Sequence, residues 1–262
     1  MKTVLRGSVR MVERRSAEDQ LKEKIVEIGN VLGELGYVST LGSYASGNIS
    51  AKLLGTRLVL ITPSGLAKNA LDKRMICTIT LEGRVVRGRL KPTSETPTHL
   101  AIYRNRPDVN AIVHSHPPYA TAFSVARTSI PVVTIEMAGL LGCNVPVAGF
   151  AIPGTKRLAT KVVRCLKNSS AVLLQNHGLV VVGSTLDEAV SATMAIEENA
   201  RLLYYASIIG RPRTIPRKDT MKIRKKIQTE YGQRKTCNQH LNRSCSFQLR
   251  QCRRQLEPPF IH

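Results

Sequence analysis

Apolar residues recur every three or four positions near the start of the chain, which predicts an amphipathic helix. Ser16 is followed three residues later by Asp19, the spacing of a helix-capping pair. Beyond that pair one face carries leucine and isoleucine, at Leu21, Ile25, Ile28, Leu32 and Leu35. We therefore expect a first helix that begins after Ser16 and ends near Gly36.

Shorter apolar runs then predict strands, separated first by turns and later by helices. The expected strands cover residues 49–53, 57–62, 76–81, 84–87, 111–114, 171–175 and 179–182, with Glu82-Gly83 as a hairpin turn. A second helix is expected to begin near Glu95. Three further helices are expected to cover residues 117–126, 154–166 and Leu186–Ile209. Because hairpins come first and helices alternate with strands afterwards, the pattern favours an α/β fold whose mixed or largely antiparallel sheet is covered by helices.

Length and composition exclude a disordered or membrane-spanning chain. The 262 residues are 42% hydrophobic, which suits one large α/β domain or two small ones. No apolar run reaches the roughly 18 residues of a spanning helix, and the N-terminus lacks the apolar core of a secretory signal. The six cysteines show no close pairing in the first 236 positions, as expected in a reducing compartment. We expect a cytoplasmic protein with no membrane partner.

The positive charge is concentrated at the ends of the chain. Of the formal net charge of +21, residues 1–15 hold +4, residues 16–210 hold +6 and residues 211–262 hold +11. Helical spacing of apolar residues persists at Met221, Ile223 and Ile227 and then stops near residue 236. The sequence thus predicts a basic N-terminal extension (1–15), one folded domain (16–236) and a basic tail (237–262).

Two interpretations of that tail are open. Its cysteines and histidine, Cys237, His240, Cys245 and Cys252, would form a zinc cluster, but no C-x₂-C pair is present. A disordered basic tail that binds polyanions weakly and salt-dependently is the alternative. Since the tail offers few aromatic side chains for base stacking, we expect no specific nucleic-acid partner.

Three histidines and one carboxylate are candidates for a metal site. His114 and His116 are one residue apart at the end of an expected strand, so alternation places both imidazoles on one face. His177 lies in a loop between two strands, and Glu95 is an isolated carboxylate before a helix. Three neutral imidazoles and one carboxylate make a normal Zn²⁺ site with open coordination once the carboxylate moves. An isolated H-x-H is often only a polar strand edge, so the accompanying motifs decide.

Three short turns accompany these residues, each containing glycine or a hydroxyl side chain. They are Gly47-Asn48, Ser64-Gly65 and Thr93-Ser94. Such turns present backbone N–H groups and small donors to a phosphate without needing a lysine. The chain has neither G-x-G-x-x-G after a strand nor a G-x-x-x-x-G-K-[ST] loop, so a nucleotide cofactor has no support.

Taken together, five motifs resemble those of the class II aldolases related to L-fuculose-1-phosphate aldolase. The matching segments, in family order and spacing, are Gly47-Asn48-Ile49-Ser50, Thr62-Pro63-Ser64-Gly65, Ser94-Glu95, His114-Ser115-His116 and His177-Gly178. The resemblance extends over residues 18–235, and the wider superfamily includes L-ribulose-5-phosphate 4-epimerase and the aldolase-like domain of adducin. An adducin-like binding domain would lack the histidines that this chain retains.

The resemblance implies a three-layer α/β/α sandwich with a mostly antiparallel central sheet, assembled as a homotetramer with active sites between subunits. It implies one Zn²⁺ per subunit, held by Glu95, His114, His116 and His177. Glu95 would also leave the metal to act as acid/base, with Tyr231 as the candidate second catalytic acid. The phosphate cradle would consist of Gly47, Asn48, Ser64, Gly65, Thr93 and Ser94.

The implied reaction is zinc-dependent, reversible cleavage of a ketose 1-phosphate to dihydroxyacetone phosphate and an aldehyde through a metal-stabilised enediolate. Ile135 and Pro153 stand where fuculose-phosphate aldolase has an aromatic pair around the aldehyde, so the aldehyde stays open. A 4-epimerase or a methylthioribulose-1-phosphate dehydratase would use the same ligands. Thr62 and Glu95 differ from the lysine and aspartate of the epimerases and favour the aldolase, whereas residues 96–101 look epimerase-like.

Overall fold

The computed structural model describes residues 16–38, 40–41 and 44–230. The N-terminal extension, Tyr231 and the tail with Cys237, His240, Cys245 and Cys252 lie outside the described residues. The division of the chain into extension, domain and tail therefore stays a prediction, as do both interpretations of the tail.

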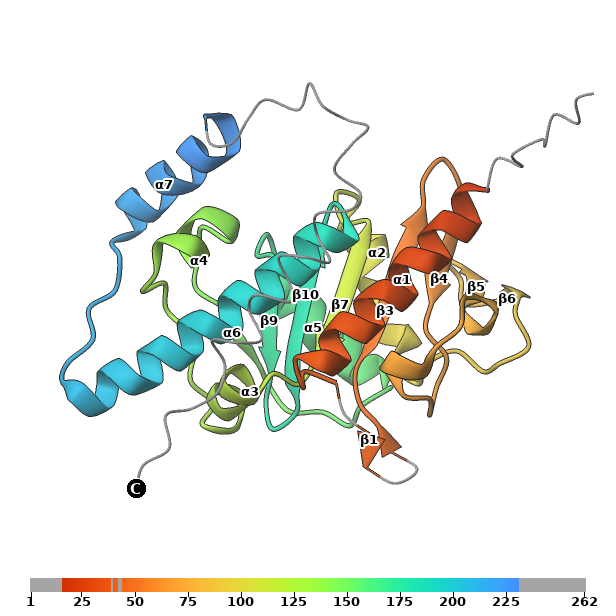
Figure 1. The fold of residues 1–262 in the computed structure, drawn as a ribbon, viewed down its shortest axis with the longest axis horizontal. Coiled ribbons are helices and arrows are strands. Elements are labelled where there is room, and N and C mark those ends of the chain that lie inside the picture. The colour runs from red at the N-terminus through yellow and green to blue at the C-terminus, as the bar shows by residue number, and fades with distance from the viewer. Residues whose placement is uncertain (1–15, 39, 42–43, 231–262) are drawn as a thin grey trace, which may run out of the picture.

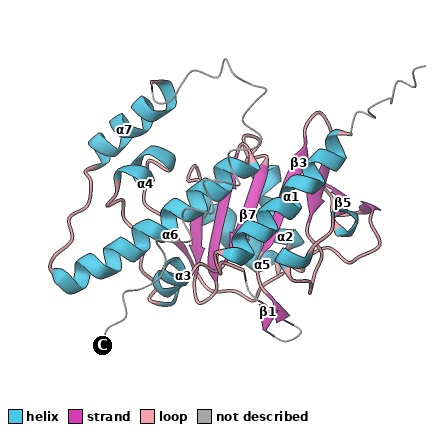
Figure 2. Ribbon diagram, in the orientation of Figure 1, coloured by secondary structure: helices cyan, strands magenta, loops and turns pink. Residues whose placement is uncertain are grey.

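An eight-stranded sheet forms the centre of the molecule (Figure 2). Its strands, in spatial order, are β6 (Val85–Arg87), β5 (Cys77–Thr80), β4 (Leu58–Ile61), β3 (Asn48–Leu53), β7 (Ala111–Ser115), β10 (Gly178–Gly183), β9 (Ala171–Leu174) and β8 (Val147–Ala148). Every neighbouring pair is antiparallel except β8 and β9, which are parallel. The expected mixed, mostly antiparallel sheet is confirmed. A separate two-stranded ribbon joins β1 (Thr40–Leu41) to β2 (Tyr44–Ala45).

Helices cover both faces of this sheet and make three layers (Figure 1). One face packs against α1 (Ala17–Glu34), α3 (Pro118–Val125) and α6 (Leu186–Ile209), with α4 (Ile135–Leu140) packed on α6, and the other against α2 (Thr96–Asn105) and α5 (Lys156–Leu166). Alternation along β7 shows the division, because Ala111 and Val113 belong to the first core and Ile112 to the second. The short helix η1 (Lys68–Ala70) contacts α1 and is followed by η2 (Lys73–Met75), and α7 (Arg217–Thr229) packs on α4.

Local sequence patterns place the long elements well. Ser16 caps α1 by accepting a hydrogen bond from the backbone N–H of Asp19 at 3.1 Å, as expected from their spacing. Helix α4 was not expected, because six residues are too few to show a helical period. Its start is nevertheless marked by Thr134, whose side chain accepts from the N–H of Met137. None of the helices that the structure describes is both long and apolar enough to cross a membrane.

Candidate metal centre and adjoining pocket

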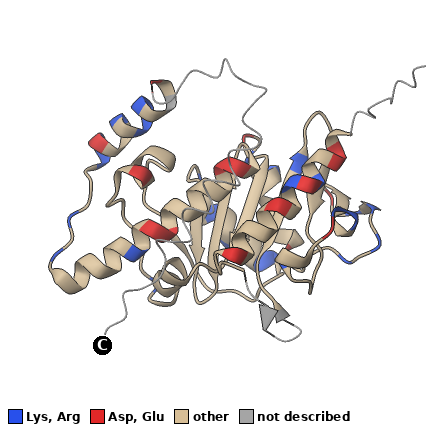
Figure 3. Cartoon of the chain, in the orientation of Figure 1, with Lys and Arg blue, Asp and Glu red and all other residues tan. Residues whose placement is uncertain are grey.

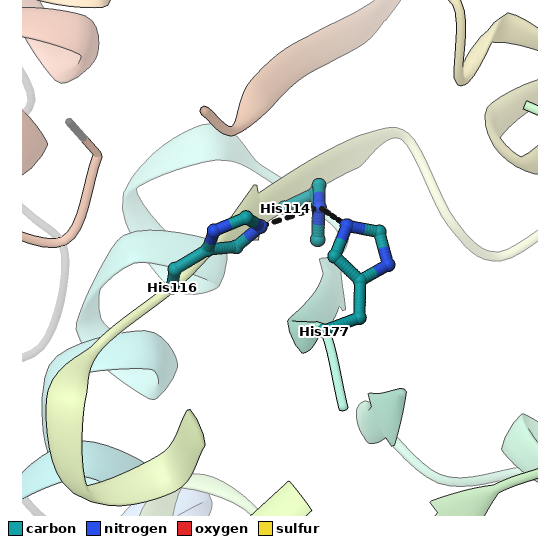
Figure 4. A group of neighbouring side chains, drawn as sticks. All are labelled: His114, His116 and His177. Atoms are coloured by element: carbon teal, nitrogen blue, oxygen red, sulfur yellow. Dashed lines mark hydrogen bonds between the residues drawn. The ribbon is translucent and has the colours of Figure 1, made fainter. Parts of the chain in front are cut away.

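Three imidazoles meet at one edge of the sheet (Figure 4). His114 lies near the end of β7, and His116 follows two residues later. Because β10 pairs with β7 in antiparallel register, the loop before β10 brings His177 to the same edge. Nε2 of His114 lies 3.2 Å from Nε2 of His116 and 3.2 Å from Nε2 of His177. The structure thus brings together the three histidines that the sequence selected.

A backbone contact orients the central ring. Nδ1 of His114 lies 2.9 Å from the carbonyl oxygen of Leu179 on the neighbouring strand. A carbonyl can only accept, so Nδ1 carries a proton, and Nε2 is the nitrogen that faces the other two histidines. This arrangement, an outer hydrogen bond that fixes the tautomer of a ring, is typical of metal-binding histidines.

Residues on either side of His177 make the close approach possible. A Cβ at Gly178 would lie 2.5 Å from Cδ2 of His116 and 2.7 Å from the carbonyl oxygen of Ser115, so only glycine fits. Asn176 adopts a left-handed backbone with φ of 55°, which asparagine tolerates better than most residues. The loop is therefore built to hold the ring of His177 against those of His114 and His116.

Glu95 lies against this cluster from the N-terminus of α2. Its Oε1 is 3.3 Å from Nε2 of His114 and 3.4 Å from Nε2 of His177, and the residue is only 6% exposed. Two nitrogens at 2.0–2.1 Å from one tetrahedral Zn²⁺ would stand about 3.3–3.4 Å apart. The observed separations and the donor set of three imidazoles and one carboxylate fit a single divalent cation.

Burial and neighbouring charges keep most of the candidate metal ligands in the protonation state that binds a cation. Burial lowers the pKa of His116 to about 3 and of His177 to about 4, helped by the neighbouring His114, so both rings are neutral at pH 7. Burial alone would raise the pKa of Glu95, but the charge and hydrogen bond of His114, with His177, outweigh it and lower that pKa to about 2. Burial also opposes charge on His114, yet the Glu95 carboxylate raises its pKa. Glu95 is therefore an ionised carboxylate beside the cluster.

A cavity of about 250 Å³ is lined by His116, His177 and Glu95, and His114 lies next to these three side chains. All six residues expected to form the cradle line it, namely Gly47, Asn48, Ser64, Gly65, Thr93 and Ser94. Pro153 lines the cavity too, whereas Ile135 lies on α4, is 56% exposed and does not reach it in the described chain. Ile135 and Pro153, the positions where fuculose-phosphate aldolase has an aromatic pair, therefore do not line the cavity together within a single chain.

Sequence reasoning missed two residues here. Lys68 lines the cavity although the turns were expected to need no lysine, and its position three residues after Gly65 was the available signal. His99 lies one helical turn after Glu95 on α2 and is buried, with its Nε2 2.5 Å from Oδ1 of Asn48. Its i, i+4 spacing from Glu95 was the signal that could have found it.

Comparisons with known proteins identify relatives of this chain by sequence and by fold. The profile of the Class II Aldolase and Adducin N-terminal domain matches residues 23–204. The chain is 34% identical over 212 residues to 5-deoxy-D-ribulose 1-phosphate aldolase of Bacillus thuringiensis serovar kurstaki, covering 81% of this chain and 97% of that protein. It is 40% identical over 182 residues to L-fuculose phosphate aldolase of Methanococcus vannielii, covering 70% of this chain and 94% of that protein.

A third relative carries a different activity in its name. The 3-oxo-tetronate 4-phosphate decarboxylase of Escherichia coli O6:H1 is 34% identical over 203 residues, which cover 74% of this chain and 91% of that protein. Among solved structures, an L-fuculose 1-phosphate aldolase superimposes with a TM-score of 0.74 at 31% identity, covering 80% of this chain and 96% of the other. On its sequence, its fold and the extent of both matches, the chain belongs to the family of class II aldolases and adducin N-terminal domains.

Proposed function

We propose that the chain is a zinc-dependent lyase that reversibly cleaves a ketose 1-phosphate, of the L-fuculose 1-phosphate type, into dihydroxyacetone phosphate and an aldehyde. One observation carries the proposal. The Glu95 carboxylate lies 3.3–3.4 Å from two imidazole nitrogens and lines the same cavity as three turns suited to a phosphate. A metal ligand set, an acid/base group and an anion site thus open into one space.

His114, His116, His177 and Glu95 would hold the cation, and their nitrogen-rich donor set suits Zn²⁺, one per subunit. A divalent cation bound there supplies Lewis acidity, which stabilises negative charge on substrate oxygens as a carbon–carbon bond breaks. The cradle residues Gly47, Asn48, Ser64, Gly65, Thr93 and Ser94 would hold the phosphate through side-chain donors and backbone N–H groups.

Glu95 would act as the acid/base that transfers a proton to or from a carbon atom of the substrate. It is ionised at neutral pH and is therefore able to accept a proton. When its carboxylate moves away from His114 and His177, it loses the interactions that lower its pKa and becomes a stronger base. In the cleavage direction the C4 hydroxyl would give its proton to the Glu95 carboxylate, the C3–C4 bond would break, and Glu95 would deliver that proton to C3 of the dihydroxyacetone phosphate half. Tyr231, which lies outside the described residues, would act as the second catalytic acid at the oxygen of the aldehyde half.

We also propose a homotetramer in the cytoplasm. Support for subunit contacts comes from the C-terminal half of α6, where large apolar side chains are exposed, at Leu202, Tyr204, Tyr205, Ile208 and Ile209. The rings of Tyr119, Tyr204 and Tyr205 lie with centroids 5.6–6.0 Å apart beside them. An exposed apolar cluster of this kind marks an interaction surface. Sedimentation of the purified protein tests the assembly.

A decarboxylase is the second candidate, favoured by the 34% identity to the 3-oxo-tetronate 4-phosphate enzyme. It would use the same cation site, because loss of carbon dioxide next to a ketone also leaves charge on an oxygen. The epimerase and dehydratase alternatives share the site as well.

The deciding experiment is a panel of ketose 1-phosphates, ketose 5-phosphates, methylthioribulose 1-phosphate and a 3-oxo-tetronate 4-phosphate, with metal analysis of the same preparation. The aldolase releases dihydroxyacetone phosphate, the decarboxylase releases carbon dioxide, and the epimerase and dehydratase release neither. Purified protein without a stoichiometric divalent cation, or without dihydroxyacetone phosphate from every ketose 1-phosphate, would contradict the proposal.

A further inference from the structure

Lys68 occupies an unusual position for a lysine. It is only 3% exposed, begins η1 three residues after Gly65, and lines the cavity beside His116 and His177. Within the described chain it is the only lysine or arginine among the residues lining this cavity. A lysine buried to this degree is rare unless its charge is compensated.

The first helix is shaped to seat this residue. A Cβ at Gly29 of α1 would lie 2.4 Å from the carbonyl oxygen of Lys68, and one at Gly33 would lie 2.7 Å from Cβ of Asn69. Gly29 and Gly33 are one helical turn apart, so together they form a flat stripe on which η1 lies. Glycine is a poor helix former, and its use at both positions reflects the close approach of η1.

The ammonium of Lys68 has little compensation inside the protein. Nζ donates one hydrogen bond, to the carbonyl oxygen of Leu66 at 2.6 Å, and no carboxylate in the described part of the chain forms an ion pair with it. Burial lowers the pKa of Lys68 to about 8, with no opposing charge to restore it. An ammonium has three donors, so two stay available for a ligand in the cavity.

The other groups that line this wall are neutral. Ser64, Gly65, Thr93 and Ser94 can supply hydrogen bonds to a phosphate but cannot balance its two negative charges. Glu95, which lines the same cavity, adds a further negative charge. We infer that Lys68 binds the phosphate group of the substrate directly and supplies the positive charge that the turns lack. This inference rests on the proposed function, in that the ligand is a phosphorylated sugar.

The test compares Lys68→Met, Lys68→Arg and the matched control Lys156→Met, which removes an exposed lysine at the start of α5. Binding of inorganic phosphate and of dihydroxyacetone phosphate to each protein is measured by calorimetry. Loss of one charged hydrogen bond predicts about 10- to 100-fold weaker binding to Lys68→Met, little change for Lys156→Met, and an intermediate value for Lys68→Arg.

Thermal unfolding separates binding from a merely structural role. Without ligand, Lys68→Met is expected to unfold at the same or a higher temperature than the parent, because it removes a buried, uncompensated charge. Added phosphate is expected to raise the unfolding temperature of the parent and of Lys156→Met but not of Lys68→Met. A lower unfolding temperature for Lys68→Met together with unchanged phosphate affinity would overturn the inference.

The outcome is independent of which sugar is cleaved. Lys68-dependent phosphate binding in a protein that releases no dihydroxyacetone phosphate would contradict the proposed aldolase and leave the phosphate site standing. Aldolase activity with the same KM and the same inhibition by inorganic phosphate in Lys68→Met would contradict the site and leave the aldolase standing.

Discussion

His99 donates a hydrogen bond from Nε2 to Oδ1 of Asn48, across 2.5 Å of buried space. Burial lowers the pKa of His99 to about 3, so the ring is neutral and has one N–H. Its Nδ1 must then accept from Oγ of Ser50 at 2.6 Å, and Ser50 accepts from the hydroxyl of Tyr103 at 2.8 Å. Since Oδ1 of Asn48 accepts this hydrogen bond, its NH₂ group is available to donate to a ligand in the cavity.

This chain of hydrogen bonds predicts that His99 positions Asn48. In His99→Leu the Asn48 amide loses its partner, and we expect KM for the sugar phosphate to rise about tenfold while metal content stays the same, measured by kinetics and metal analysis. Tyr103→Phe, which removes only the far donor, is expected to change KM less. Equal effects of both substitutions, or lost metal in His99→Leu, would contradict the positioning role.

Replacing Glu95 separates proton transfer from metal binding. Glu95→Gln leaves three imidazoles in place, so we expect the protein to keep most of its metal while carbon–carbon cleavage slows by about 10²–10⁴-fold. Turnover of ketose 1-phosphates and the metal content of the same sample are the measurements. A near-normal rate would show that Glu95 is a spectator.

Removing the central histidine acts on the cation itself. His114 is the ring within 3.2 Å of both others, so His114→Ala is expected to lose stoichiometric metal, and activity with it. Treatment of the parent protein with a chelator should abolish activity, and added Zn²⁺ should restore it to the parent but not to His114→Ala. Full activity after exhaustive chelation would contradict a metal-dependent reaction.

Glu18 couples stability to pH at the edge of the sheet. Burial alone would raise its pKa, but hydrogen bonds from Arg87, Lys22 and Thr78 outweigh this and lower it to about 2. A lowered pKa in the folded state means stability that is complete above the unfolded value near 4.5 and is lost as pH falls toward 2. Glu18→Gln is therefore expected to cost about 1–2 kcal/mol at pH 7.

The pH series is the control for that assignment. Denaturant unfolding of the parent and of Glu18→Gln at pH 7, 5, 4 and 3 should give a difference that is constant down to about pH 5 and then shrinks. A difference that does not depend on pH would assign the loss to packing rather than to the ionised carboxylate.

Truncation after Lys235 tests the basic tail. The residues that line the cavity all precede it, so we expect aldolase activity to survive while any affinity for polyanions falls. The affinity of the full-length chain for polyanions should decrease steeply with salt concentration, because such binding is driven by the release of counterions. Loss of activity with retained nucleic-acid binding would contradict the assignment of residues 237–262 as a dispensable tail.

Local features of the sequence determined much of this protein. Capping at Ser16, the alternation of apolar residues in the strands and the H-x-H pair are effects of near neighbours, so they can be recognised without a structure. The three histidines and Glu95 were also selected from the sequence, and the structure brings His116, His177 and Glu95 within 3.2–3.3 Å of Nε2 of His114. The resemblance to the family then added the three-layer arrangement, which the structure confirms.

Tertiary structure decided what depends on contacts between distant segments. Lys68 became a buried charge only because Gly29 and Gly33 let η1 lie against α1, and nothing in its own neighbourhood predicts burial. His99 contacts Asn48 because the fold brings α2 against the strand β3, so that two residues 51 positions apart in the sequence share one hydrogen bond. A side chain's solvation and partners are set by segments remote in the sequence, and the local pattern that specifies a helix or a strand contains no information about them.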